Sequence, residues 1–541
     1  MGKAAAAIAV IATALLVTSA GSAATRVVPA AGTTYTVAFT SGSLPANVDK
    51  LVADAGGTIV VRLPQIGGLG VVSSSPAFAA KMSTVASVAA AERSIKSSLG
   101  PVDGQHGAQG GSQRDNSGRH SGKATGAGAD PQPEPDSLGS QQWDKMRMNV
   151  SLLGSYAVSR GRSDVKVALT DTGVDQSHPD IAPNLDVANS RSFVPYEPTI
   201  QDFNGHGTWT ASAVGAPING IGVSGVAPNV SLVELKTNDT NGDGEFLYLD
   251  EAIVYAGDKH FDVLSSSIIA YAPVCKGGPV GCDNADYILA QRAVDYARSR
   301  GVTIVAALGN DNLDLSDRAA LGDIFATPGG VAELPGTLDG VIGVSSTGYF
   351  NDKAFYSSYG LGSADVAAPG GDSVFETAPA SYTGEGRLVG AWSSTSQAPA
   401  DQQPIFQGQE CFRSVCAPYA WMQGTSMAAP NAAGVAALIV SRYGDFSNGQ
   451  NGNNDNTGGG DNNSGDNSRR SGGRTHMSPE QVEQILLGSA ASQSCPNPRT
   501  VVYNLGFPYD SATCQGGSRS NGFYGAGIVN ALAALTGNVR R

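Results

Sequence analysis

The segment V-K-V-A-L-T-D-T-G-V-D, residues 165–175, is a short apolar run that ends in a polar turn. It predicts a buried β-strand from Val165 to Thr170, with Asp171 directly after the strand. A helical pattern spans Asp286 to Arg300, and further apolar runs of strand length lie at 230–235, 261–266 and 302–308. Strands that alternate with helices are typical of a parallel sheet covered by helices. We therefore expect an α/β domain from about residue 140 onward.

The composition of the chain limits the possible classes of protein. It has 541 residues, of which 41% are hydrophobic, and its formal net charge is −13. At about 150 residues per domain, this length predicts three or four units. An acidic chain disfavours nucleic acid as a partner, since phosphate binding depends on Lys and Arg. The composition argues against a nucleic-acid packager, a polytopic membrane protein and a fully disordered chain.

The first 24 residues have the features of a secretory signal peptide. Lys3 precedes an apolar run from Ala4 to Val17, and small residues at 19–24 provide a typical cleavage site. The apolar run is shorter than the roughly 20 residues of a membrane-spanning helix, so an uncleaved anchor is the less favoured alternative. We expect a secreted, extracellular protein with no stable membrane anchor.

Export permits disulfide bonds, and the cysteines are placed to form them. The six cysteines fall into three couples that are close in sequence: Cys275 and Cys282, Cys411 and Cys416, Cys495 and Cys514. Pairing between nearest neighbours is our expectation, with free buried thiols as the alternative. No couple has the C-x-x-C spacing of a zinc site.

Residues 25–98 predict a small α+β unit ahead of the α/β domain. Its strands are expected at 34–39, 58–63 and 70–73, and its helices at 47–55 and 77–88. The order β-α-β-β-α is most of a ferredoxin-like unit, and the last strand of such a unit is not evident in the sequence.

Three other segments have compositions that set them apart. Residues 99–139 are rich in Gly, Ser, Gln and Pro, which predicts a flexible linker. Two insertions interrupt the α/β domain, one at about 371–420 and one at about 444–475. The second is rich in Asn, Gly, Asp and Ser but lacks the repeat of calcium-binding β-rolls, and we expect a disordered surface loop there.

Three polar motifs follow predicted strands or begin predicted helices, where α/β proteins place their ligands. They are D-T-G-V-D at 171–175, N-G-H-G-T at 204–208 and G-T-S-M-A-A-P at 424–430. Taken singly, they also fit a turn residue, a buried histidine and a helix N-cap. Together and in this order, they are specific.

Asp171, His206 and Ser426 from these motifs are the ingredients of nucleophilic acyl transfer. A serine becomes a good nucleophile when a base removes its proton. A histidine titrates near neutral pH and can be that base, and a carboxylate orients the imidazole and stabilises its charged form. Asn310, at the end of the strand predicted for 302–308, is the candidate hydrogen-bond donor to the oxyanion.

In this order and context, the motifs resemble the signatures of the subtilisin family of serine proteases. The resemblance covers about residues 140–533, apart from the two insertions. It implies a subtilisin-like fold of three layers, α, β and α, with a mostly parallel sheet. It also implies a serine endopeptidase that hydrolyses peptide bonds of protein or peptide substrates through an acyl-enzyme intermediate. No organic cofactor and no oligomer are indicated, and we expect a monomer.

The unit at 25–98 is similar to the propeptide of that family, which acts as an intramolecular chaperone and inhibitor. The resemblance implies a zymogen that processes itself. The cut is expected between about residues 95 and 139.

The sequence departs from the family pattern at several positions. Trp209 replaces a second histidine after His206, and Asn431 replaces a histidine after A-A-P. Neither position carries the proton transfer. Ser267, Ile268 and Ile269 match the family segment that pairs with the substrate backbone, but Ile269 stands where the family has glycine. A β-branched side chain there is expected to narrow the specificity pocket or to shift the strand.

The resemblance also implies structural calcium. The strong site of the family matches Asp180, Asn219 and the carbonyl groups of the loop at 217–223, and oxygen ligands from a tight loop suit Ca²⁺. The alternative is a plain turn with a capping Asp. A second pattern, D-T-N-G-D-G-E at 239–245 with Asp250 at the twelfth position, is similar to the opening of an EF-hand loop. It is the weaker candidate, because EF-hands prefer Glu at that position.

Two other classes of function compete with a protease. The first is a secreted binding or surface protein that kept the fold and lost the activity. Ile269 is its best support, and the presence of all four expected catalytic side chains counts against it. The second is a lipase or esterase, but those enzymes use G-x-S-x-G and the chain order Ser, Asp, His. Here the order is Asp, His, Ser.

Overall fold

The computed structural model describes residues 32–99, 136–274, 284–327, 329–376, 378–379, 381–444, 477–505 and 510–538. The predicted signal peptide, most of the predicted linker and most of the second insertion lie outside these ranges. Cys275 and Cys282 also lie outside them.

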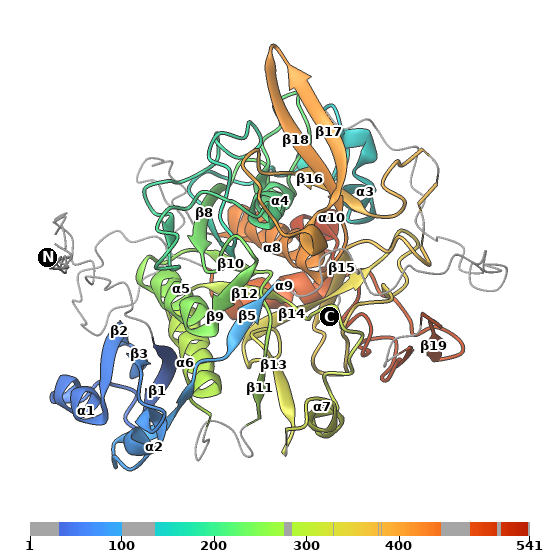
Figure 1. Ribbon diagram of the computed structural model, residues 1–541. Coiled ribbons are helices and arrows are strands. Elements are labelled where there is room, and N and C mark those ends of the chain that lie inside the picture. Colours follow the sequence, from blue (N-terminus) through green and yellow to red (C-terminus); the bar gives the residue numbers. More distant parts are fainter. Residues whose placement is uncertain are drawn as a thin grey trace, which may run out of the picture.

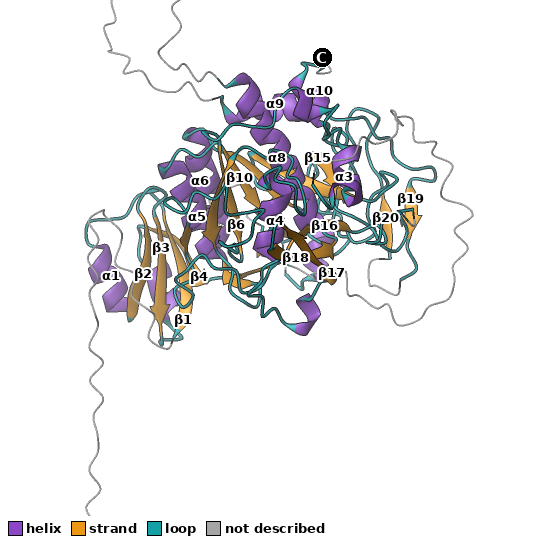
Figure 2. Cartoon of the chain, turned by 90° about the horizontal axis from the view of Figure 1, so that it is seen from above, coloured by secondary structure: helices purple, strands orange, loops and turns teal. Residues whose placement is uncertain are grey.

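A seven-stranded sheet forms the centre of the larger part of the molecule (Figure 2). Its order is β15-β14-β12-β10-β6-β8-β7, and its paired strands run parallel. The four strands predicted from the sequence are confirmed as β6, β8, β10 and β12. The bounds are β6 Lys166–Asp171, β7 Arg191–Ser192, β8 Ser231–Lys236, β10 Val263–Ser266, β12 Thr303–Ala307, β14 Val341–Thr347 and β15 Val366–Pro369.

Helices cover both faces of this sheet because successive side chains of a strand point to opposite faces. In β6, Ala168 packs with α5 and α6, whereas Val167 and Leu169 pack with the helices of the other face. The fold is therefore the predicted three-layer α/β/α arrangement. The bounds of these helices are α4 His206–Gly215, α5 Phe246–Asp258, α6 Ala285–Ser299, α8 Thr425–Tyr443, α9 Pro479–Ser489 and α10 Ala531–Leu535. The shorter helices are α3 Trp143–Arg147 and α7 Arg318–Ile324.

The N-terminal module, defined here as residues 32–93, is a separate four-stranded antiparallel sheet of order β2-β3-β1-β4 with α1 and α2 (Figure 1). The ferredoxin-like order is confirmed, and β4 is the strand that the sequence did not reveal. The helix predicted for 77–88 ends at Ser83, because Val88 and Ala90 turn inward as alternate residues of β4. The bounds are β1 Thr33–Phe39, α1 Val48–Ala55, β2 Gly57–Leu63, β3 Gly68–Ser73, α2 Phe78–Ser83 and β4 Val88–Arg93.

The module packs on α5 and α6, and one apolar core continues from it into the larger domain. A Cβ on Gly70 of β3 would overlap Leu247 of α5, so glycine permits the close approach. After the module, β5 (Lys96–Ser98) leaves it and pairs with β9 (Asp243–Glu245) of the larger domain. The first residue of the predicted linker, Leu99, is buried there.

The first insertion forms part of a small sheet of order β16-β18-β17. The β17–β18 hairpin projects from the domain, and a disulfide joins Cys411 to Cys416 near its end (Figure 1). A second disulfide joins Cys495 to Cys514. These two predicted pairs are confirmed. The remaining strands are β11 Ala270–Pro273, β13 Val331–Leu334, β16 Leu388–Ala391, β17 Ile405–Phe412, β18 Val415–Met422, β19 Thr500–Val502 and β20 Ser511–Thr513.

None of the helices in the described ranges has the length and the apolar character needed to cross a lipid bilayer.

Candidate active site

The predicted catalytic side chains meet at the carboxyl edge of the central sheet. Asp171 is the last residue of β6, His206 is the first residue of α4, and Ser426 lies in the first turn of α8. Asn310 follows β12, which lies two strands from β6 in the sheet. A parallel sheet brings such residues to one edge even though they are far apart along the chain.

Asp171 holds His206 in a fixed orientation. The Nδ1 atom of His206 lies 2.7 Å from Oδ1 of Asp171, and both side chains are buried. The same Oδ1 accepts the backbone N–H of Thr172 at 2.8 Å, and Oδ2 accepts the hydroxyl of Thr210 at 3.0 Å. Because both carboxylate oxygens are engaged, the carboxylate cannot rotate freely. The arrangement fixes the imidazole with Nε2 free to act as a base.

Asp202 stabilises the Asp171–His206 pair indirectly, through hydrogen bonds to neighbouring residues. Its Oδ1 accepts the hydroxyl of Thr172 at 3.0 Å, and its Oδ2 accepts the N–H and the hydroxyl of Thr208 at 2.9 and 2.7 Å. Burial raises the pKa of Asp202. Sequence reasoning missed Asp202 and Thr210. For Thr210 a signal existed, since it lies one helical turn after His206 on the same helix.

Gly207 follows His206, and a side chain does not fit at this position because the backbone of Gly173 lies too close. A Cβ on Gly207 would overlap the carbonyl oxygen of Gly173. The N–H of Gly207 donates to the hydroxyl of Thr172 at 3.0 Å. The start of α4 is thus pressed against the turn that carries Asp171.

Ser426 lies beside the segment predicted to bind substrate. Its hydroxyl donates to the carbonyl oxygen of Ser267 at 3.3 Å, and the hydroxyl of Ser267 donates to the carbonyl oxygen of Ser426 at 2.9 Å. In this conformation the Ser426 hydroxyl is directed to Ser267 rather than to His206. Catalytic hydrogen bonds often form only when substrate is bound.

Asn310 is anchored by its carbonyl group. Its Oδ1 accepts the backbone N–H and the hydroxyl of Thr425, both at 2.9 Å. The amide nitrogen is left on the side of the turn at Gly424 that leads into Ser426. This is the geometry needed for a fixed N–H donor near a carbonyl carbon attacked by Ser426.

A short strand of this chain, β5, pairs with backbone segments beside these residues. Lys96 of β5 pairs with Glu245, and Ser98 pairs with Asp243. On the other side of β5, Ser98 and Ile269 exchange two backbone hydrogen bonds, both 3.0 Å long. Residues 96–98 therefore lie between two strands, as an extended peptide would. Ile269 takes part in this pairing through its backbone N–H and C=O.

Trp209 and Asn431, which stand where the family has histidine, form hydrogen bonds to the surrounding scaffold. The indole N–H of Trp209 donates to the carbonyl oxygen of Ala420 at 3.1 Å. Asn431 accepts from the buried ammonium of Lys145 at 2.7 Å and donates to the carbonyl oxygen of Pro369 at 3.0 Å. Both side chains stabilise the scaffold around α4 and α8.

Asp180 and Asn219 lie together, as the calcium hypothesis requires. The amide of Asn219 donates to Oδ1 of Asp180 at 3.0 Å, and Tyr419 and the N–H of Val223 donate to Oδ2 at 2.8 and 3.0 Å. A second carboxylate, that of Asp136, accepts the N–H of Asn219 at 2.9 Å. Burial, with a smaller effect of Asp136, raises the pKa of Asp180 to about 7.

The carboxylates of this loop already accept hydrogen bonds. Oδ1 of Asp136 also accepts the N–H of Gly220 at 2.6 Å, its Oδ2 accepts the hydroxyl of Ser224, and Asn219 turns its amide N–H rather than its oxygen toward Asp180. Ca²⁺ prefers oxygen ligands, so an ion bound here would have to replace these donors. Asp136 was not among the residues that the sequence suggested.

The EF-hand-like segment at 239–250 does not form a calcium-binding loop. Asp239 accepts the backbone N–H groups of Asn241 and Asp243, and β9 follows at once. Asp250 lies inside α5. In the described part of the chain, no group of three or more His, Cys, Asp or Glu side chains is placed to hold a metal ion.

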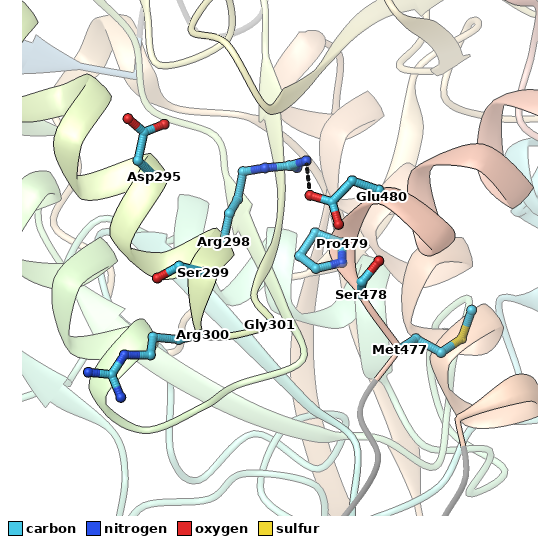
Figure 3. Close-up of a pocket in the computed structure, with 9 residues that line it drawn as sticks. All are labelled: Asp295, Arg298, Ser299, Arg300, Gly301, Met477, Ser478, Pro479 and Glu480. Atoms are coloured by element: carbon cyan, nitrogen blue, oxygen red, sulfur yellow. Dashed lines mark hydrogen bonds and ion pairs between the residues drawn. The ribbon is translucent and has the colours of Figure 1, made fainter.

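A surface pocket of about 580 Å³ lies elsewhere (Figure 3). It is formed by the end of α6 and the start of α9, where Arg298 and Glu480 form an ion pair of 2.7 Å. Gly301 at its border precedes β12, so the pocket lies at the amino edge of the sheet. It is not part of the candidate active site.

Comparison with known proteins agrees with this geometry. The model of the subtilase family of peptidases matches residues 162–527. Subtilisin NAT of Bacillus subtilis subsp. natto is 34% identical over 289 residues, which cover 53% of this chain and 58% of that protein. Subtilisin Savinase of Lederbergia lenta is 31% identical over 288 residues, which cover 53% of this chain and 80% of that protein. The chain thus spans little more than half the length of Subtilisin NAT.

Two solved structures share the fold at low sequence identity. The epidermin leader peptide processing serine protease of Staphylococcus aureus has a TM-score of 0.64 and 19% identity, and the match covers 94% of this chain and 99% of that chain. Fervidolysin of Fervidobacterium pennivorans, a keratinolytic enzyme related to subtilisin, has a TM-score of 0.59 and 18% identity, with 94% and 61% covered.

Proposed function

Because the chain belongs to the subtilase family of serine peptidases, we propose that it is a secreted endopeptidase made as a self-processing zymogen. The observation that carries the proposal is the 2.7 Å hydrogen bond between Asp171 and His206, at the sheet edge where Ser426 begins α8. Protein or peptide chains are the proposed substrates, and the proposed enzyme acts as a monomer.

Each side chain has one role in the proposed reaction. His206 takes the proton of the Ser426 hydroxyl as that oxygen attacks the scissile carbonyl carbon, and it later gives the proton to the leaving amine. Asp171 keeps the imidazole in the correct tautomer and stabilises the imidazolium. The amide N–H of Asn310 stabilises the oxyanion. Water then repeats the attack on the acyl-enzyme and frees Ser426.

The substrate backbone is proposed to bind where β5 lies. The N–H and C=O of Ile269 bind those of Ser98, and β9 supports the other edge of the strand. Ser267 and Ile268 extend this wall of the groove toward Ser426. An extended peptide adds to exposed strand edges in this way because backbone hydrogen bonds do not depend on side-chain identity.

The N-terminal module is proposed to be an inhibitory propeptide. Support comes from β5, which fills the groove that a substrate needs, while the module itself rests on α5 and α6. Removal is proposed to follow a cut on the carboxyl side of Leu99, within residues 99–139.

The proposed activity is tested by chemical labelling of the full chain in a secreting host. A fluorophosphonate should attach to Ser426 of the parent and should leave Ser426→Ala unlabelled, and the intact mass should fall by the mass of the N-terminal segment in the parent alone. A chain that stays unlabelled even after an added protease has cut the linker would instead be a binding protein that lost the activity.

The proposal includes a structural calcium ion held by Asp180, Asn219 and backbone oxygens of 217–223, where its charge would offset the buried carboxylates. At a free calcium concentration 100-fold above Kd, the ion should raise the unfolding temperature by about 3–4 °C. The measurement is thermal unfolding with calcium and with a chelator. Asp180→Asn should lose this response, whereas Asp295→Asn, at an exposed position of α6, should keep it. Equal unfolding temperatures with calcium and chelator would contradict the site.

A further inference from the structure

Two carboxylates of the larger domain are buried where the N-terminal module rests. Asp250 of α5 and Asp286 of α6 are both fully buried. Neither oxygen of Asp250 has a hydrogen-bond partner among the described residues. Oδ1 of Asp286 accepts the hydroxyl of Thr36 at 2.7 Å, and Oδ2 accepts the N–H of Ile95 at 3.2 Å. Both donors belong to the segment that precedes β5, not to the larger domain.

Helix spacing places these carboxylates on the surfaces that the module covers. On α6, Asp286, Leu289 and Arg292 follow one another at intervals of three residues and share one face. Leu289 contacts Gly68 of the module, and Arg292 donates to the carbonyl oxygens of Phe39 and Ile66 at 2.8 and 3.1 Å. On α5, Asp250 lies three residues after Leu247, which contacts Gly70 of the module.

The charges around this pair are mostly negative. Glu92 of β4 faces the start of α6, where it accepts the N–H of Ala285 at 2.6 Å. Glu245, at the start of α5, forms an ion pair with Lys96, whose side chain is largely exposed. Arg292 on the same face of α6 binds carbonyl groups rather than a carboxylate. Within the described ranges, neither Asp250 nor Asp286 forms an ion pair.

Such surroundings favour the neutral form of both acids. Burial is the largest effect on Asp286, and it outweighs the hydrogen bonds from Thr36 and Ile95. With smaller contributions from the negative charges of Glu92 and Glu245, it raises the pKa of Asp286 to about 8. Burial and the neighbouring Asp286 raise the pKa of Asp250 well above its usual value. A buried carboxylate without a partner is costly when charged, so it takes up a proton instead.

We infer that docking of the N-terminal module is linked to proton uptake by Asp250 and Asp286, so that acid strengthens the docking and a rise in pH weakens it. The inference rests on the proposed function in one respect. Release of the module affects activity only if substrate binds where β5 now lies. The partner of this surface is the module of the same chain.

The sign follows from comparing the two states. Undocking removes the Thr36 and Ile95 groups that cover Asp286. We expect water then to reach Asp286 and the neighbouring Asp250, so that their pKa values return toward about 4. With it, the pKa values are raised. Docking is therefore strongest below about pH 4, weakens as pH rises toward the raised pKa values, and becomes independent of these groups above them. Each carboxyl should lower the docking constant about tenfold per pH unit over that interval.

The test uses the full chain with Ser426→Ala, which stays intact whether or not the protein is active. Hydrogen exchange at the backbone N–H groups of Ser98, Phe246 and Ile269 reports docking, because each donates across β5 or its flanks. Variants are compared at equal pH, which cancels the intrinsic pH dependence of exchange. Between pH 6 and pH 8, protection in the parent should fall 100-fold or more relative to the double variant Asp250→Asn/Asp286→Asn.

The controls keep the inference falsifiable. Asp54→Asn, which changes an exposed carboxylate of α1, should follow the parent. If the double variant does not fold, the single variants should each lose about half of the logarithmic pH effect. The infrared band of protonated carboxyl groups, recorded in the parent at pH 7, should weaken in each single variant. Equal pH dependence in parent and variants, or an infrared band that does not change, would overturn the inference.

Failure of the inference and failure of the proposed activity are distinct results. Exchange that depends on these two carboxylates, in a chain that fluorophosphonate does not label, would retain the proton linkage and reject the peptidase. If Ser426 is labelled but docking does not depend on either carboxylate, the peptidase is retained and the proton linkage is rejected.

Discussion

Replacing Ser426 with alanine is expected to lower kcat for peptide hydrolysis by about 10⁴- to 10⁶-fold. The side chain lies in the first turn of α8, beside Ser267 of the proposed substrate-binding segment and next to the turn anchored by Asn310. Without its oxygen, no nucleophile remains for His206 to activate. The expected change lies in kcat rather than KM, since the hydroxyl contributes little to holding the substrate. The measurement is steady-state hydrolysis of a casein-derived peptide, after an added protease has removed the N-terminal segment from parent and variant alike.

The same assay distinguishes the role of Asn310 from that of the nucleophile Ser426. Asn310→Ala should lower kcat by about 10²- to 10³-fold, because it removes one preorganised donor to the oxyanion. It also removes the acceptor for the N–H of Thr425, so the unfolding temperature must be measured beside the rate. A rate within threefold of the parent in either variant would contradict the assigned roles.

The fold of the larger domain is predictable because its signals are local. Apolar runs of strand length and the motifs that end them occur within single segments such as 165–175, and the predicted β6, β8, β10 and β12 all form. The missed strand β4 has a different cause. Its residues, including Ala89, Ala90 and Ala91, are small and apolar, and such a run fits a helix as well as a strand.

The occupied groove was not predictable from the sequence. β5 has three residues, Lys96–Ser98, of which two are serines, and its partner β9 lies far along the chain. A strand this short has no periodicity of its own, and only the long-range pairing defines it. The sequence instead assigned Leu99 to the linker, whereas its side chain is 2% exposed.

The buried carboxylates illustrate the same difficulty. In the sequence, Asp250 is recognisable only as the last position of an EF-hand-like pattern, and Asp286 only as the start of a predicted helix. Their environment depends on Thr36 and Ile95, which come from a segment that the sequence places in a separate unit. Burial that arises between two units leaves no local pattern, so the proton linkage emerges only from the assembled structure.

Replacing Asp171 with asparagine is expected to lower kcat by about 10³- to 10⁴-fold at neutral pH. Oδ1 of Asp171 accepts from both His206 and the N–H of Thr172, so an amide nitrogen there would face a second donor. Asparagine should therefore turn its nitrogen toward the hydroxyl of Thr210, which can also donate to the carbonyl oxygen of Gly207. The tautomer of His206 would then survive, and the loss would come from the missing negative charge.

The KM of the asparagine variant should stay close to that of the parent, because Asp171 contacts His206, Thr172 and Thr210 and the lost charge acts on the reaction rather than on substrate binding. Asp262→Asn, a buried carboxylate at the amino edge of the sheet that binds the N–H of Lys166, is the matched control and should leave kcat unchanged. A variant at Asp171 that retains more than a tenth of the parental kcat would show that the carboxylate does not support His206 in the way the geometry requires.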